Sequence, residues 1–368
     1  MVRRRGTAPK ADPPSSGADE PAASVAANLP SNGSIRPPSM MDVARLAGVS
    51  HQTVSRVLNG HPSVRSNTRL RVLASIQELG YRPNNVARAL ATGRSRTIGV
   101  IGLDSTLYGP AATMHGVDEA ARRAEYFVST VGLASIDRES ILESVDRLAD
   151  GAVEGLVVIA PLSSAAEALV DLPVDLPIVA VNTHPKSDIA AVSVDQELGA
   201  RKATEFLLET GRSTVWHLAG PPSWSESQGR LEGWRGALAD AGVDAPPPLT
   251  GDWSARSGYE AGQVLARMSD VTAVFAANDH MTLGLLRALH ERGRAVPDDV
   301  SVVGFDDIPE AGYFLPPLTT IRQDFSEVGR RCVRLLVEQI ESNSRSTEQS
   351  VVAPELVVRS STTAVGRS

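Results

Sequence analysis

The sequence has almost no cysteine and no long apolar run, and both absences narrow the class of protein that it encodes. Its single cysteine, Cys332, excludes an internal disulfide framework, and a lone thiol suits a reducing compartment. No stretch approaches the roughly 18 uninterrupted apolar residues of a membrane-spanning helix. The basic start Arg3–Arg5 is followed by Pro, Ala, Ser and acidic residues instead of the apolar block of a secretory signal. We therefore expect a cytoplasmic protein.

The motifs of common enzyme classes are also missing. There is no Gly-x-Ser-x-Gly nucleophile turn, no phosphate-cradling Gly-Lys-Ser/Thr and no His-Glu-x-x-His. The seven histidines are scattered, and we interpret His217 and His280 as packed or surface residues rather than as metal ligands. The adjacent carboxylates Asp306 and Asp307 could serve as an acid–base pair, but no nucleophile accompanies them. We expect no enzyme, no metal site and no cofactor.

Charge is distributed unevenly along the chain. The 368 residues carry 36 Lys and Arg against 43 Asp and Glu, a net of −7. Residues 36–96 nevertheless hold ten arginines, no lysine and only Asp42 and Glu78 as acids, for a net of +8. Residues 97–368 carry 22 basic against 38 acidic side chains, a net of −16. A small basic unit on a large acidic body indicates a polyanionic partner for the former and not for the latter.

Residues 41–59 have the pattern of two short helices around a tight turn. Each helix has apolar residues at helical spacing on one face only. Gly48 ends the first helix because a residue without Cβ tolerates the left-handed conformation. Ser50 can accept a hydrogen bond from the first amides of the second helix. The residues of the two apolar faces are Val43, Ala44, Ala47, Val54, Val57 and Leu58.

The other side of the second helix is polar and has the chemistry to read DNA. It carries His51, Gln52, Ser55 and Arg56. Gln pairs with adenine, Arg pairs with guanine, and His can donate or accept, so three of the four can read base edges in a major groove. This pattern predicts a helix-turn-helix whose second helix is the recognition helix. A helical hairpin with a solvated polar face is the alternative that these residues leave open.

The segments on either side of this motif complete the expected head. Residues 1–38 are rich in Pro, Ala, Ser and Gly, which predicts a disordered tail. A third helix is expected over residues 67–79, with Gly80 as its end, to complete a three-helix core. After Pro83 comes a helix of about seven residues, which is too short to be stable alone in water. We expect it to order only against a partner, as a hinge; an ordinary linker is the alternative.

From Thr97 onward, apolar strands alternate with helices, which predicts parallel sheets covered on both faces. The chain is too long for one ordinary core, so two doubly wound subdomains with a cleft between them are expected. The expected strands are Ile98–Gly102, Leu156–Ala160, Ile178–Asn182, Thr214–Leu218, Ala273–Ala277 and Val300–Phe305. The helices expected between them include Glu197–Leu208, Arg230–Ala241, Ser257–Met268 and Met281–Arg292.

Polar side chains that follow these strands are the candidate ligand-binding residues, because ligands bind beyond the carboxyl ends of such strands. Arg230 is expected to open a helix after the loop 219–229. Carboxylate, amide and guanidinium groups with Trp253 suit a neutral polyol, since planar groups grip pairs of hydroxyls and an indole covers the apolar face of a sugar. Ordinary turn and cap residues are the alternative interpretation. The strand-end candidates are Asn182, Asn278, Asp279, Asp306 and Asp307.

Five segments carry a recognisable pattern in a fixed order across the chain. They are Asp42–Ser50 with Thr53–Asn59, Gly80–Asn84, Val274–Asp279, Ser301–Asp307 and Pro317–Gln323. These residues closely resemble the lactose-repressor (LacI/GalR) family of bacterial transcription regulators. The resemblance runs from about residue 39 to about residue 360 and is specific, because the motifs recur in order across both expected domains.

The resemblance implies a homodimer that grips a palindromic operator and a sugar-type effector between two periplasmic-binding-protein-like subdomains. It also implies hinge helices that enter the minor groove, with Leu90 wedged into a base step. Sugar hydroxyls would bind Arg230, Asn278 and Asp306, and Trp253 would stack on the ring. The expected DNA contacts are Ser50, His51, Gln52, Thr53, Ser55, Arg56, Asn59, Arg88 and Leu90. The expected effector contacts are Leu107, Thr113, Asn182, Arg230, Trp253, Asn278, Asp306 and Gln323.

The expected fold is an all-α helix-turn-helix head with a hinge helix, followed by an α/β body of two doubly wound parallel-sheet subdomains. The expected boundaries are a disordered tail 1–38, a DNA-binding domain 39–83, a hinge helix and linker 84–96, an N-subdomain 97–194 plus 325–350, and a C-subdomain 195–324 plus 351–360.

The sequence also departs from the family pattern at informative places. The repressor after which the family is named has aspartate where Asn182 stands and tyrosine where His51 stands, so both the sugar and the operator can differ. The chain ends at Ser368, without a tetramerising helix, so a dimer is expected. We expect a repressor that a galactoside or related glycoside releases from its operator. A purine-type co-repressor, or a sugar-binding transport protein, is the alternative; the missing export signal and the arginine-rich head disfavour the latter.

Overall fold

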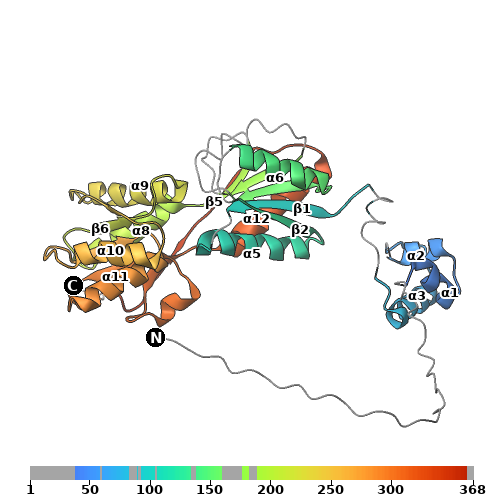
Figure 1. The fold of residues 1–368 in the computed structure, drawn as a ribbon, viewed down its shortest axis with the longest axis horizontal. Coiled ribbons are helices and arrows are strands. Elements are labelled where there is room, and N and C mark those ends of the chain that lie inside the picture. Colours follow the sequence, from blue (N-terminus) through green and yellow to red (C-terminus); the bar gives the residue numbers. More distant parts are fainter. Residues whose placement is uncertain are drawn as a thin grey trace, which may run out of the picture. The chain divides into compact units, whose positions relative to one another are not determined.

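The structure, a computed structural model, describes residues 38–58, 60–82, 89, 93–103, 106–133, 138–159, 176–181 and 189–362 (Figure 1). The chain forms two compact units, residues 1–84 and residues 85–368. Several expected features lie outside the described residues. They are the tail up to residue 37, residues 84–88 and 90–92 of the hinge, and the site residues Asn59, Arg88, Leu90 and Asn182.

The first unit is a three-helix head. Its helices are α1 (Met40–Ala47), α2 (His51–Leu58) and α3 (Ser66–Leu79). Gly48 ends α1 with φ +63°, the left-handed conformation that the sequence predicts. Ser50 caps α2, because its Oγ accepts a hydrogen bond from the backbone amide of Thr53 at 3.2 Å. The buried core of the head consists of Val43, Ala44, Ala47, Val54, Val57, Val72 and Tyr81.

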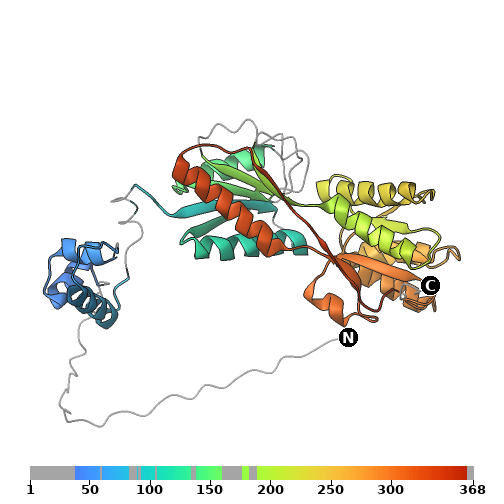
Figure 2. The same ribbon diagram turned by 180° about the vertical axis from the view of Figure 1, so that it is seen from behind.

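The first subdomain of the body is a six-stranded sheet in the order β11-β5-β4-β3-β1-β2, with all neighbours parallel. Helices α5 and α12 share one apolar cluster with this sheet and α6 shares another, so the helices cover both faces (Figure 2). The strands are β1 (Thr97–Leu103), β2 (Phe127–Leu133), β3 (Gly155–Ile159), β4 (Ile178–Val181), β5 (Ala190–Val194) and β11 (Gln349–Val352). The helices are α5 (Tyr108–Arg123), α6 (Arg138–Asp150) and α12 (Phe325–Ser342).

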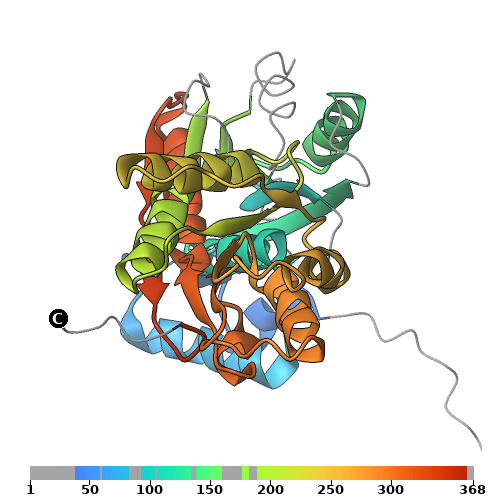
Figure 3. The same cartoon turned by 90° about the vertical axis from the view of Figure 1, so that its left-hand side faces the viewer.

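The second subdomain repeats this architecture, with the order β12-β10-β9-β8-β6-β7 and only β12 antiparallel to its neighbour. Helices α8 and α9 pack on one face and α10 and α11 on the other (Figure 3). The strands are β6 (Trp216–Ala219), β7 (Leu249–Thr250), β8 (Ala273–Ala276), β9 (Ser301–Asp306), β10 (Thr319–Arg322) and β12 (Glu355–Val357). The helices are α8 (Gln196–Glu209), α9 (Ser225–Asp240), α10 (Ala255–Leu265), α11 (Asp279–Glu291) and the short 3-10 helix η1 (Pro309–Tyr313).

Within residues 189–362 the chain passes between the two sheets three times. The crossovers lie between β5 and α8, between β10 and α12, and between β11 and β12. The expected third boundary, after residue 350, is wrong by two residues, because Val351 and Val352 pair with β5 in the first sheet. The second subdomain also extends beyond residue 360, since the Ser361 hydroxyl accepts from the amide of Thr319 at 2.8 Å.

One further expectation is wrong in a way that affects the site. Helix α9 begins at Ser225, so Arg230 lies in its second turn and does not open it.

No helix in the part of the chain that the structure describes is long and apolar enough to cross a lipid bilayer.

Candidate functional site

Helix α2 presents polar side chains to solvent on the side that faces away from the head's core. Val54 and Val57 are buried, whereas His51, Gln52 and Arg56 are exposed. Thr53 and Ser55 are half-buried, and the hydroxyls of Ser50 and Thr53 lie 2.9 Å apart. The arrangement leaves an exposed amide, imidazole and guanidinium on one short helix, which is the chemistry needed to contact base edges.

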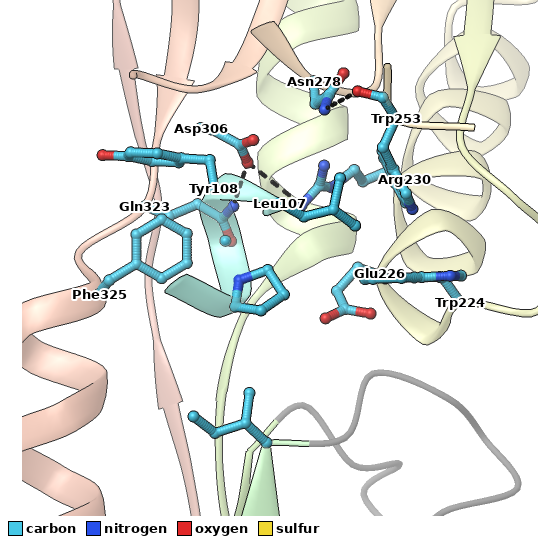
Figure 4. A pocket seen from close by; sticks show the side chains of 13 residues that line it. Leu107, Tyr108, Trp224, Glu226, Arg230, Trp253, Asn278, Asp306, Gln323 and Phe325 are labelled. Atoms are coloured by element: carbon cyan, nitrogen blue, oxygen red, sulfur yellow. Dashed lines mark hydrogen bonds and ion pairs between the residues drawn. The ribbon is translucent and has the colours of Figure 1, made fainter. Parts of the chain in front are cut away.

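The body holds a pocket of about 530 Å³, including its open mouth, at the carboxyl ends of strands from both sheets (Figure 4). Five of the side chains expected to bind effector reach it from the second subdomain, and Leu107 reaches it from the first. The residues that line it are Leu107, Tyr108, Gly109, Pro110, Ile159, Trp224, Glu226, Arg230, Trp253, Asn278, Asp306, Gln323 and Phe325.

Arg230 is the central cation of the pocket and is only 4 % exposed. Its guanidinium carbon lies 3.8 Å from the ring centroid of Phe305 and 5.4 Å from that of Trp253, distances that fit cation–π contacts. Its Nη1 donates to the carbonyl of Ala277, and its Nη2 lies 3.8 Å from Asp306 Oδ1. Burial lowers the pKa of Arg230, and the charge of Asp306 opposes that effect.

Asp306 is the central anion, at the end of β9. Burial raises the pKa of its carboxyl to about 6. The electrostatic effects of Arg230 and His280 and the hydrogen bond from Gln323 oppose this rise. Gln323 Nε2 donates to Oδ1 at 2.7 Å (Figure 4). The backbone of Asp306 has φ +111°, a region that non-glycine residues rarely occupy and that concentrates at functional sites.

Asn278 and Trp253 are held together on the opposite wall. The Asn278 side chain caps α11 by accepting from the amide of Met281 at 2.8 Å, and its Nδ2 donates to the carbonyl of Trp253 at 3.0 Å. Trp253 has φ +74° and meets Trp224 edge to face, with ring centroids 5.5 Å apart. The cap function that the sequence leaves open for Asn278 is therefore present together with its place in the pocket.

Sequence reasoning missed several pocket residues. Trp224 and Glu226 fall in the segment expected to be a loop, yet they sit at the start of α9 and face the pocket. Tyr108 follows the expected Leu107 directly, and its ring meets Phe325 edge to face at 5.8 Å. The early start of α9 is the signal that could have revealed the first pair, since Ser225 and Glu226 suit the first turn of a helix.

Three expected residues lie outside the pocket lining. The Thr113 hydroxyl donates to the carbonyl of Gly109 in its own helix at 2.8 Å, so the assignment of Thr113 to the wall is wrong. Asp279 is buried and accepts from Thr320 Oγ1 at 2.6 Å, which holds β10 to α11. Asp307 binds Arg322 of β10 and Arg359, which follows β12, each at 2.7 Å, and so ties the end of β9 to β10 and to the segment after β12.

The described histidines and acids form no metal centre. Among the residues that the structure describes, no three His, Cys, Asp or Glu side chains cluster closely enough to hold an ion. His217 is fully buried between the rings of Phe275 and Trp234, and its Nδ1 lies 3.0 Å from the Phe275 carbonyl. Burial lowers its pKa to about 4, so this imidazole is a neutral core residue.

Comparison with known proteins identifies both parts of the chain. Residues 39–84 match the bacterial regulatory proteins of the lacI family, and residues 204–362 match a periplasmic binding protein-like domain. The chain is 33% identical over 334 residues to the lactose operon repressor of Escherichia coli (strain K12), a match that covers 89% of this chain and 91% of the repressor. The chain belongs to the lacI family. The fold class expected from the sequence is confirmed.

Other relatives of this lacI-family protein add detail. It is 34% identical over 332 residues to the HTH-type transcriptional repressor PurR of Vibrio parahaemolyticus serotype O3:K6 (strain RIMD 2210633), over 87% of this chain and 97% of PurR. A solved structure of the lac repressor dimer bound to operator and the anti-inducer ONPF superposes with a TM-score of 0.80 at 33% identity, over 89% of this chain and all of that chain. A complex of the transcriptional regulator CelR with cellobiose has a TM-score of 0.66 at 32% identity, over 88% and 99% of the two chains.

PurR and the lactose operon repressor are transcriptional repressors. The protein is therefore a DNA-binding transcriptional repressor with an effector-binding body, as the sequence predicts at this level.

Proposed function

We propose that this repressor responds to a neutral polyhydroxy ligand, a sugar or glycoside, in the pocket between its two subdomains. The observation that carries the proposal is the pairing of two carboxylates, Asp306 and Glu226, with the indoles of Trp253 and Trp224 in one pocket. Carboxylates accept hydrogen bonds from the several hydroxyls of a sugar, and an indole covers the apolar C–H face of the ring.

The charges of the pocket favour a neutral ligand over a phosphorylated one. Asp306 and Glu226 supply two carboxylates, and Arg230 is the single cationic side chain among the lining residues that the structure describes. Arg230 already contacts Asp306, Gln196 and the Ala277 carbonyl, so its guanidinium is largely committed within the protein. A phosphate would enter a site with excess negative charge, which costs binding free energy in a partly buried environment.

A purine-type co-repressor is the second candidate, because PurR proteins are among the most similar relatives. The shape of this pocket favours it less. A planar base is bound well between rings that stack on it, whereas the pocket's aromatic pairs meet edge to face, at interplanar angles of 67° for Trp224 with Trp253 and 78° for Tyr108 with Phe325. A sugar ring requires only one covering indole.

The DNA end of the proposal assigns base contacts to the exposed side chains of α2. His51, Gln52 and Arg56 would contact base edges, and Ser50 and Thr53 would contact the phosphate backbone. A homodimer would present two such helices to a palindromic operator. Arg88 and Leu90, which lie outside the described residues, would contact the minor groove from the hinge.

Regulation requires two conformations of the body that differ in affinity for the ligand. We propose that ligand binding changes the angle between the subdomains and lowers the affinity of the paired heads for the operator. Galactosides and related glycosides are the first ligands to test.

Direct binding distinguishes the ligand classes. The intrinsic fluorescence of Trp224 and Trp253 should change on titration with one or more of glucose, galactose, lactose and cellobiose, and not with sugar phosphates or purine bases. Asp306→Asn should abolish that change while leaving operator binding intact. A fluorescence response to purine bases alone would replace the sugar with a purine co-repressor, and no response to any of these ligands would remove the pocket as the effector site.

A further inference from the structure

Two glutamines that lie on different crossovers are hydrogen-bonded to each other. Gln196 is the first residue of α8, directly after the crossover from β5. Gln323 precedes Asp324, the residue that caps α12, on the crossover from β10. Gln196 Nε2 donates to Gln323 Oε1 at 2.9 Å, so one side-chain bond joins two of the three connections between the subdomains.

This bond belongs to a closed ring that includes two of the charged side chains of the pocket, Arg230 and Asp306. Arg230 Nε donates to Gln196 Oε1 at 2.8 Å, and Gln323 Nε2 donates to Asp306 Oδ1 at 2.7 Å. Arg230 Nη2 and Asp306 Oδ1, 3.8 Å apart, close the ring. Arg230, Asp306 and Gln323 line the pocket, but Gln196 does not.

The two charged ends fix the orientation of both amides. A guanidinium can only donate, so the Gln196 oxygen must face Arg230 and its NH₂ must face Gln323. An ionised carboxylate can only accept, so the Gln323 NH₂ must face Asp306 and its oxygen must face Gln196. The directions of all three hydrogen bonds agree, and the ion pair of Arg230 with Asp306 closes the ring. A change at either charged end therefore alters the bond between the glutamines.

We propose that Gln196 is a positioning residue that transmits ligand binding at Arg230 and Asp306 to the crossovers, and hence to the angle between the subdomains. The inference rests on the proposed function, because it takes the pocket as the ligand site. A ligand hydroxyl that binds Asp306 or Arg230 competes with the ring for the same atoms. Weakening the ring releases the Gln196–Gln323 bond and frees two crossovers to change conformation together.

The test uses the full-length protein and three variants. Gln196→Leu removes both hydrogen bonds at similar volume, and Gln196→Glu keeps an acceptor for Arg230 but cannot donate to Gln323 when ionised. Gln228→Leu is the matched control, since Gln228 is an exposed residue of α9 whose amide bonds only the Pro222 carbonyl among the described contacts. Ligand affinity is measured by tryptophan fluorescence with lactose and cellobiose, and operator affinity by fluorescence anisotropy with and without the sugar.

We expect Gln196→Leu and Gln196→Glu to change sugar affinity by less than about threefold. Both variants should reduce the sugar-dependent change in operator affinity by at least about fivefold, which is the size of a typical allosteric coupling. Gln228→Leu should behave as wild type. The proposal is overturned if both Gln196 variants keep the full response, or if sugar affinity and response fall in the same proportion, since that pattern means Gln196 only shapes the pocket.

A ligand-free measurement separates this inference from the proposed function. If wild type binds no sugar, the proposed function fails, yet the crossover bond should still bias the angle between the subdomains. Gln196→Leu should then shift operator affinity by at least about threefold relative to Gln228→Leu, and an unchanged operator affinity would overturn the proposal.

Discussion

Asp306 combines a buried carboxyl with contacts to Arg230 and Gln323, and we therefore expect ligand binding at the proposed site to depend on pH. Burial raises its pKa to about 6 in the folded protein, above the ordinary 3.8. Between those two pH values the native state binds more protons than the unfolded chain. The ionised carboxyl therefore lowers the free energy of unfolding above pH 6, and this loss of stability disappears as the pH falls toward 4.

Sugar binding should show the opposite trend. If only the ionised carboxyl of Asp306 accepts a ligand hydroxyl, sugar affinity falls about tenfold from pH 7 to pH 5. The measurement is a fluorescence titration at several pH values with the body's tryptophans as reporters. Asp306→Asn should bind weakly at every pH; sugar affinity that is independent of pH in wild type would show that Asp306 does not act as a charged acceptor.

Arg56 is the exposed guanidinium on α2 and the best candidate for a bidentate contact to guanine. Arg56→Ala should reduce the preference for operator over unrelated DNA by about 1–3 kcal/mol, with a smaller loss in non-specific affinity. Anisotropy titrations with operator and scrambled duplexes measure both quantities. An equal loss on both duplexes would make Arg56 a phosphate contact instead.

At the scale of whole elements, the sequence predicts best where periodicity and burial agree. The buried strands β3, β4, β8 and β9 and the helices α8, α10 and α11 appear within a few residues of their expected positions. Strand β2 was not predicted, because it lies at a sheet edge and exposes both apolar Phe127 and polar side chains. Helix α12 is not among the expected helices, although Asp324 marks its start by accepting a hydrogen bond from the amide of Glu327.

The site could be anticipated only in part. Residues at strand ends, such as Asn278 and Asp306, were predictable because parallel strands bring their carboxyl ends together. Trp224 and Glu226 carry a weaker signal: the loop-like sequence around Pro222 favours a later helix start, and only the acidic first turn at Ser225 and Glu226 indicates where α9 begins. The Gln196–Gln323 bond joins residues 127 positions apart and has no local signature.

Helices α5 and α12 contact each other through glycines, and this contact positions Phe325 at the pocket. A Cβ on Gly116 would meet the carbonyl of Phe325, and one on Gly329 would meet the backbone of Gly116. Gly116→Val should therefore lower the free energy of unfolding by about 1–3 kcal/mol through overpacking and weaken sugar binding by displacing Phe325. Urea denaturation and the fluorescence titration check the two effects.

Ala111→Val, at an exposed position of the same helix, is the control for the β-branched side chain. Stability of Gly116→Val equal to that of this control would mean that the helices separate without cost and that their close contact does not hold Phe325.

At the scale of the whole molecule, the basic head and the acidic body should respond differently to salt. Residues 36–96 have a net charge of +8, and residues 97–368 have a net charge of −16. Each phosphate contact releases counterions, so operator affinity should fall as the salt concentration rises from about 50 to 200 mM. The logarithm of the affinity should fall linearly with the logarithm of the salt concentration, with a slope of about 0.9 for each phosphate contacted. Sugar affinity should change less than about twofold over this range, because a neutral ligand displaces no counterions. A steep salt dependence of ligand binding would indicate a charged effector.

The central claim is that one chain links a sugar pocket to a DNA-reading head, and one titration tests it most directly. Operator affinity of the full-length protein is measured by anisotropy with increasing lactose or cellobiose, beside the variant Asp306→Asn. The account predicts that the sugar weakens operator binding of wild type by about 5- to 150-fold, a coupling of about 1–3 kcal/mol, and leaves the variant on its operator. A sugar that binds the pocket while operator affinity stays constant, or an equal response in Asp306→Asn, would contradict it.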